Sequence, residues 1–173
     1  TITYKFGSAA GTIAAMTSET SVSWTPALTL GNQIPNTTSG TATLTCTTYS
    51  GSTSIGSKSI TVKLNLPASV VPTITSLTAT RVDGDVPSAW GIYVQTKSKA
   101  ALSVNGAAGS YGSAIASYSI TGGGFAGTSD TMTTGFLNTA GTITFTATVT
   151  DSRGRTSAAK TVSISVASYS APS

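Results

Sequence analysis

Apolar residues alternate with polar residues, mostly threonine and serine, in five separate segments, and this alternation constrains the fold more than any other feature. In residues 142–149, Ile143, Phe145, Ala147 and Val149 each follow a threonine. The same period of two recurs within residues 1–6, 41–49, 58–66 and 161–166. Successive side chains of a β-strand point to opposite faces, so this period separates apolar residues from hydroxyls. The pattern predicts half-buried antiparallel strands, and β-branched threonine suits their solvent-facing side.

Composition agrees with an all-β chain and excludes several other classes. The 173 residues include 34 threonines and 27 serines, and only 8% are charged. A helical bundle needs more Ala, Leu, Glu, Lys and Arg, and a disordered polyelectrolyte needs more charge. The chain lacks the glycine period of collagen and any apolar run long enough for a membrane span. The one place where a turn of helix is expected is residues 12–17.

Two sequence features predict a domain boundary near residue 70. Residues 66–72 contain two prolines, which end a strand and stiffen a short linker. The segment 39–48 resembles the segment 140–149, and each is followed by a polar turn, a lysine and a final alternating strand. We therefore expect two consecutive antiparallel β-sandwich domains of immunoglobulin or fibronectin type. Residues 1–70 form the smaller, sandwich-like domain and residues 71–173 the immunoglobulin-like one. Further strands of the second domain are expected near 74–81, 90–95, 100–105, 115–120 and 129–133.

Charge and cysteine content indicate no nucleic-acid or redox function. The nine basic and five acidic residues give a net charge of +4, but the basic residues are scattered along the chain. A nucleic-acid binder gathers them on one face, so no nucleic-acid partner is predicted, and no membrane partner either. The single cysteine, Cys46, cannot form an internal disulfide. It continues the apolar series of Ala42 and Leu44, and we expect it to be a small buried hydrophobe.

The titratable residues give no support for an enzyme. The absence of histidine removes a serine triad, and we expect no zinc site from one cysteine without histidine. The carboxylates are Glu19, Asp83, Asp85, Asp130 and Asp151. Asp83 and Asp85 lie in Asp-Gly-Asp-Val-Pro, which predicts a turn, and a calcium site there would be short of ligands. We expect no catalytic residue, no cofactor and no metal.

Aromatic residues leave one binding hypothesis open. Five aromatic residues could contact a glycan if they were exposed in a row, since flat rings stack on sugars: Trp24, Trp90, Tyr93, Tyr111 and Tyr118. The alternative is that large aromatics anchor the core, and this is the interpretation we favour for Trp90 and for Tyr111.

Several segments together resemble a known family. They are residues 86–95 (Val-Pro-Ser-Ala-Trp-Gly-Ile-Tyr-Val-Gln), 109–113, 148–156 with its Asp-Ser-Arg-Gly-Arg turn, and 169–172, and before them 24–26, 34–36 and 47–51. The chain resembles the tandem immunoglobulin-like modules of a siphovirus structural protein family of unknown function. The resemblance implies a part of the virion, in the tail or its tip, without enzymatic activity.

Three functional hypotheses follow. The first is a structural module whose partners are other virion proteins, with self-association left open. The second is a carbohydrate-binding or adhesin module that contacts glycans of the host cell wall. The third is an immunoglobulin-like repeat on a bacterial surface. The missing initiator methionine and the linker-like residues 169–173 further suggest a piece of a longer protein.

Overall fold

The computed structural model describes residues 1–83 and 86–171, except for the side chain of Asp83. Their regular elements are β-strands and two short 3-10 helices, and the predicted all-β class with antiparallel sheets is confirmed. The chain divides into two compact units. One consists of Thr1–Val70 with Tyr111–Ser113, and the other of Val71–Ser110 with the chain from Ala114 onward. The described part of the chain holds no helix with the length and hydropathy that a membrane crossing needs.

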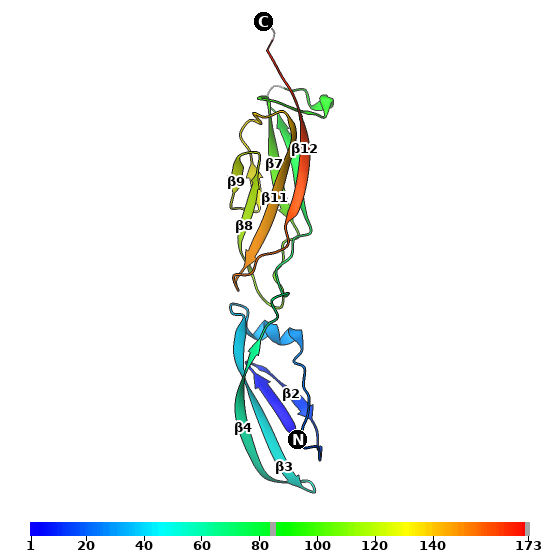
Figure 1. Cartoon of the computed structure of the whole chain (residues 1–173), viewed down its shortest axis with the longest axis vertical. Helices are drawn as coiled ribbons and strands as arrows, with labels where there is room; N and C mark the ends of the chain where they lie inside the picture. Colours follow the sequence, from blue (N-terminus) through cyan, green and yellow to red (C-terminus); the bar gives the residue numbers. More distant parts are fainter. Residues whose placement is uncertain (84–85, 172–173) are drawn as a thin grey trace. The chain divides into compact units, whose positions relative to one another are not determined.

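The first unit contains one four-stranded antiparallel sheet (Figure 1). Its strands are β1 (Ile2–Phe6), β2 (Ala9–Ala14), β3 (Ser39–Ser50) and β4 (Thr53–Asn65), in the order β2-β1-β3-β4. The segments predicted at 1–6, 41–49 and 58–66 lie in β1, β3 and β4. The turn of helix expected at residues 12–17 is wrong, because residues 12–14 belong to β2 and pair with β1.

An irregular segment, and not a second sheet, covers one face of this sheet in the described residues. The segment includes Trp24, whose ring stacks on Tyr4 at 4.9 Å, and the 3-10 helix η1 (Leu28–Gln33). Leu30 of η1 and Phe6 and Ala42 of the sheet form one buried cluster. In the described residues, the first unit therefore lacks the second sheet that the expected sandwich would have.

The hairpin of β3 and β4 is buried only near the end that this segment covers. The half-buried residues of β4, Val62 and Leu64, lie toward Asn65, whereas Thr53 to Thr61 are all exposed. Cys46 pairs with Lys58 in the uncovered part and is exposed. The prediction that Cys46 is buried is therefore wrong: its face of the strand is the apolar one, but the covering segment does not extend over it.

The second unit is a sandwich of two sheets (Figure 1). One sheet has the order β10-β7-β5 and the other the order β6-β12-β11-β8-β9. The bounds are β5 (Ser76–Asp83), β6 (Tyr93–Val94), β7 (Ser98–Asn105), β8 (Ile115–Gly122), β9 (Phe125–Gly127), β10 (Thr131–Thr133), β11 (Gly141–Asp151) and β12 (Lys160–Ala167), with the 3-10 helix η2 (Ser88–Trp90) before β6. Neighbouring strands are antiparallel except β6 and β12, which are parallel.

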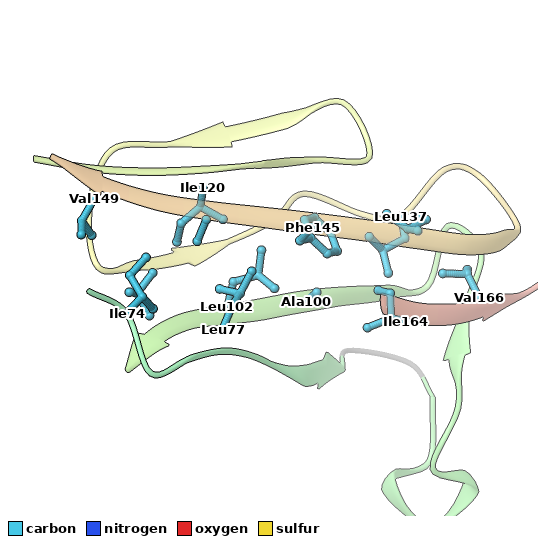
Figure 2. Close-up of a cluster of buried hydrophobic side chains, with 13 residues drawn as sticks. Ile74, Leu77, Ala100, Leu102, Ile120, Leu137, Phe145, Val149, Ile164 and Val166 are labelled. Carbon is cyan, nitrogen blue, oxygen red and sulfur yellow. The ribbon is translucent and has the colours of Figure 1, made fainter. Parts of the chain in front are cut away.

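The core of the second unit lies between these two sheets. Figure 2 shows Leu77, Ala100 and Leu102 from β5 and β7 on one side, facing Ile120 and Phe145 from β8 and β11 on the other. Burial alternates along β7 and β11 with the period of two that the sequence displays. The apolar residues thus form the inner faces of both layers, as the alternation predicts.

The outer face of the five-stranded sheet is a continuous surface of hydroxyl groups. The cross-strand pairs of β11 on this face are Thr142 with Ser165, Thr144 with Ser163, Thr146 with Thr161 and Thr121, Thr148 with Ser119, and Thr150 with Ser117. Thr144 Oγ1 and Ser163 Oγ lie 2.8 Å apart and form a hydrogen bond. Because the protein has few charges, these hydroxyl groups are what binds water on this face.

Candidate functional site

Four of the five aromatic residues considered for glycan contact are half-buried, namely Trp24, Tyr93, Tyr111 and Tyr118. Trp24 stacks on Tyr4 and packs on the core of the first unit. Tyr93 in β6 and Tyr118 in β8 pack on the core of the second unit, and β12 and β11 lie between them in the sheet. Tyr111 has a positive φ of 46° in its loop. The structure does not bring Tyr93 and Tyr118 into one row.

Trp90 is the aromatic residue that the fold exposes most clearly. Its side chain is 63% exposed, so the expectation that it anchors the core is wrong. It ends η2, whose backbone closes through the bond from Trp90 N to Pro87 O (3.1 Å). Gly91 follows with a φ of 64°, a left-handed conformation that suits glycine and turns the chain. Pro87 before the turn and Gly91 after it are the sequence signal that could have identified it.

Arg81 fastens this turn to the body of the sandwich. From β5, its guanidinium donates hydrogen bonds to the carbonyl oxygens of Ile92, Pro87 (3.3 Å) and Ser88 (3.0 Å). The planar guanidinium fork carries several donors in fixed directions, so one side chain can hold both ends of the turn. The indole of Trp90 therefore projects from a well-anchored turn.

Two lysines of the second unit lie over aromatic rings. The ammonium of Lys97 lies 5.5 Å from the centre of the Tyr169 ring, and that of Lys99 lies 4.7 Å from the centre of the Phe136 ring. Phe136 and Tyr169 are 45% and 43% exposed. Lysine stems over partly exposed rings shield apolar surface from water while the charge stays hydrated.

The carboxylate of Asp151 is used inside a turn. Asp151 is buried, and its Oδ1 accepts the backbone N–H groups of Arg153 (3.0 Å) and Arg155 (2.9 Å). Its Oδ2 lies 4.0 Å from Nη1 of Arg153, and that Nη1 also donates to Ser110 O at 2.6 Å. Burial lowers the pKa of Arg153, and the attraction of Asp151 opposes this change. The Asp-Ser-Arg-Gly-Arg motif thus closes the loop between β11 and β12.

The remaining carboxylates form no metal-binding group in the part of the chain that the structure describes, where no three His, Cys, Asp or Glu side chains gather. The calcium site considered at Asp83 and Asp85 lies outside the described side chains.

Comparison with known proteins gives a family and a distant structural similarity. A family model described as a siphovirus protein of unknown function matches residues 1–173. Among solved structures, fibronectin(III)-like modules of Clostridium thermocellum CbhA are similar, with a TM-score of 0.34 and 12% sequence identity. That match covers 75% of this chain and 86% of that chain. No curated protein matches the chain.

Proposed function

The chain belongs to a family of siphovirus proteins of unknown function, and we propose that it is a non-enzymatic structural module of the virion. In this proposal it lies in the tail or tail tip and acts as a spacer or an assembly surface between virion proteins. The observation that carries the proposal is that the family model spans residues 1–173 and so includes both β-units.

The chemistry of the chain supports a mechanical role over a catalytic one. The sequence has no histidine, and the buried carboxylate of Asp151 already accepts two backbone N–H groups in a turn. The second unit is a packed sandwich whose outer sheet face carries hydroxyls. Such a surface stays hydrated without the strong electric field that many charges would create. These features suit a module that presents surfaces and transmits load.

The proposal is tested on intact phage particles. We expect mass spectrometry of purified virions to find this chain in several copies per particle, and labelled antibodies to bind the tail in electron micrographs. A chain that is absent from purified particles and present only in infected-cell lysate would contradict the proposal. Labelling of the capsid alone would contradict its tail placement.

The exposed Trp90 favours a second candidate function, contact with a host cell-wall glycan. Its indole is 63% exposed and its turn is fixed by Arg81, and a rigid exposed ring can stack on a sugar at little entropic cost. This candidate predicts binding of the protein to purified cell walls and loss of that binding in Trp90→Ala. Tyr169→Ala, at another partly exposed ring, is the matched control. Equal binding by Trp90→Ala and the unmodified protein would contradict it.

A further inference from the structure

One edge of β12 is only partly paired. Along one side, β12 pairs with β11 from Lys160 to Val166. Along the other side, β6 pairs only with Val166 and Ala167. In the described residues, no strand pairs with this second edge between Lys160 and Ser165. The edge is therefore open over most of the strand.

The direction of the backbone groups along this edge follows from one hydrogen bond. Ala167 O accepts the N–H of Gln95 at 2.9 Å, so the backbone groups of Ala167 point toward the side of β6. The direction of the backbone groups alternates from one residue to the next along a strand. The N–H and C=O groups of Thr161 and Ser163 therefore point to the same side as those of Ala167, at positions that β6 does not pair. Such groups are a template on which another strand can pair.

A groove of about 460 Å³ runs beside this open edge. Ala79 of β5 and Tyr93 of β6 line it opposite Val162 and Ser163 of β12, and all its lining residues are uncharged. Ala79, Tyr93 and Val162 are half-buried and pack on the core. The groove thus opens between the two layers of the sandwich, where an added strand could bury apolar side chains.

The residues that precede β6 do not continue its pairing with β12. The pairing with β12 begins at Tyr93, and upstream of it Gly91 has a φ of 64°, which turns the chain. The guanidinium of Arg81 then holds Pro87, Ser88 and Ile92 on β5 through their carbonyl oxygens. Gly91 and Ile92 line the groove but form no ladder pair with β12, so among the described residues the edge stays unpaired before Val166.

We propose that this groove accepts an extended, uncharged segment of another polypeptide, which pairs with β12 as an added strand. The pairing of β6 supports this occupant, because the same edge already binds a strand at its other end. The uncharged lining favours a segment without charge, with apolar side chains at alternate positions facing Ala79 and Val162. Main-chain hydrogen bonds then supply affinity and the alternate side chains supply specificity. This inference goes beyond the structural role proposed above and does not depend on where the chain lies in a particle.

The test uses the whole chain and the peptide Thr-Ile-Thr-Phe-Thr-Ala-Thr-Lys-Lys. The peptide copies residues 142–148, of which residues 142–147 already pair with the other edge of β12, and the added lysines keep it soluble. At saturating peptide we expect the amides of Thr161 and Ser163 to exchange with solvent about tenfold more slowly.

Two substitutions at one position separate backbone pairing from side-chain contact. Ser163→Pro removes the outward N–H and places a ring at the edge, and we expect peptide affinity to fall about tenfold or more. Ser163→Ala removes only the hydroxyl, and affinity should stay within about twofold. Unchanged exchange of the amides of Val162 and Ile164, which face β11, reports that Ser163→Pro is folded. If Ser163→Pro does not fold, Thr161→Pro makes the same test.

Three results would overturn the proposal. The first is that the peptide leaves the exchange of both amides unchanged. The second is that Ser163→Pro binds as well as the unmodified protein, or that Ser163→Ala loses as much affinity as Ser163→Pro. The third is that cellohexaose slows the exchange of these amides and the peptide does not, which would make the groove a glycan site.

Discussion

At the scale of single residues, some large aromatic side chains are buried in the core and others are exposed to solvent. Phe145 is fully buried between the sheets, whereas Trp90 is 63% exposed on its turn. Both are large aromatics next to alternating or apolar sequence, so residue type alone does not distinguish them. The difference lies in the element that carries each residue, a central strand for Phe145 and the end of a 3-10 turn for Trp90.

This contrast gives the first prediction. Phe145→Ala leaves a cavity in the core, and we expect the free energy of unfolding to fall by about 3–5 kcal/mol. Trp90→Ala removes an exposed ring, and the change should stay within about 0.5 kcal/mol. Urea unfolding followed by circular dichroism measures both. A loss of stability in Trp90→Ala equal to that in Phe145→Ala would mean that the indole packs against the protein.

The second residue prediction concerns Asp151. Asp151→Ala leaves the N–H groups of Arg153 and Arg155 without their acceptor and removes the carboxylate beside a buried guanidinium. We expect a loss of about 3 kcal/mol in the free energy of unfolding. Asp130→Asn changes an exposed carboxylate and is the control, with an expected change near zero. Equal stability of the two variants in urea would show that this turn does not depend on Asp151.

At the scale of elements, the turn between β8 and β9 depends on glycine for two reasons. Gly122 has a φ of 152°, and a Cβ placed there would lie 2.5 Å from Thr144 O and 2.8 Å from Phe145 Cα. Both atoms belong to the backbone of β11, so they cannot move without disturbing the sheet. Gly124 has a φ of 82° but open space around it. Gly122 is therefore needed both because a Cβ would clash and because its φ is positive, whereas Gly124 is needed for its positive φ alone.

The turn gives a matched pair of variants. We expect Gly122→Ala to lose about 2–4 kcal/mol of stability, because the new methyl group pushes on β11 as well as straining φ. Gly124→Ala should lose only about 1–2 kcal/mol, since it meets strain without a clash. Thermal unfolding of the two variants measures the difference. If Gly124→Ala is the less stable of the pair, the close approach at Gly122 is relieved by movement of the turn.

At the scale of the whole molecule, the second unit has the parts that a domain needs to fold alone. Residues 71–173 hold both sheets of the sandwich and the core between them. The first unit has one sheet and a small buried cluster of Phe6, Leu30 and Ala42. Because the buried fraction of a chain grows with its size, the second unit should be the more stable of the two.

The corresponding prediction is made with a truncated chain. Residues 71–173 expressed alone should give a dispersed amide spectrum and unfold in one cooperative step. Residues 1–70 alone should unfold at lower urea concentration, because much of the β3–β4 hairpin is exposed. A collapsed, poorly dispersed spectrum for residues 71–173 would show that this unit needs the first one in order to fold.

The alternation of apolar residues with threonine and serine was enough to predict most strands and their inner faces, since a period of two leaves few other ways to bury those residues. The predictions at 74–81, 90–95, 100–105, 115–120, 129–133, 142–149 and 161–166 overlap β5, β6, β7, β8, β10, β11 and β12. β9 was not predicted, because its three residues are too few to display a period. Its pairing is set by β8 beside it.

The sequence by itself determined which face of each strand is apolar, because side-chain direction is a local property of the backbone. Only the tertiary structure decided which of those faces are covered, because burial depends on segments distant in sequence. Cys46 lies in the apolar series but beyond the covering segment, and Trp90 is exposed on a turn that Arg81 ties to β5. The open edge of β12 has the same origin: the alternation predicts the strand, but its neighbours decide how much of it stays unpaired.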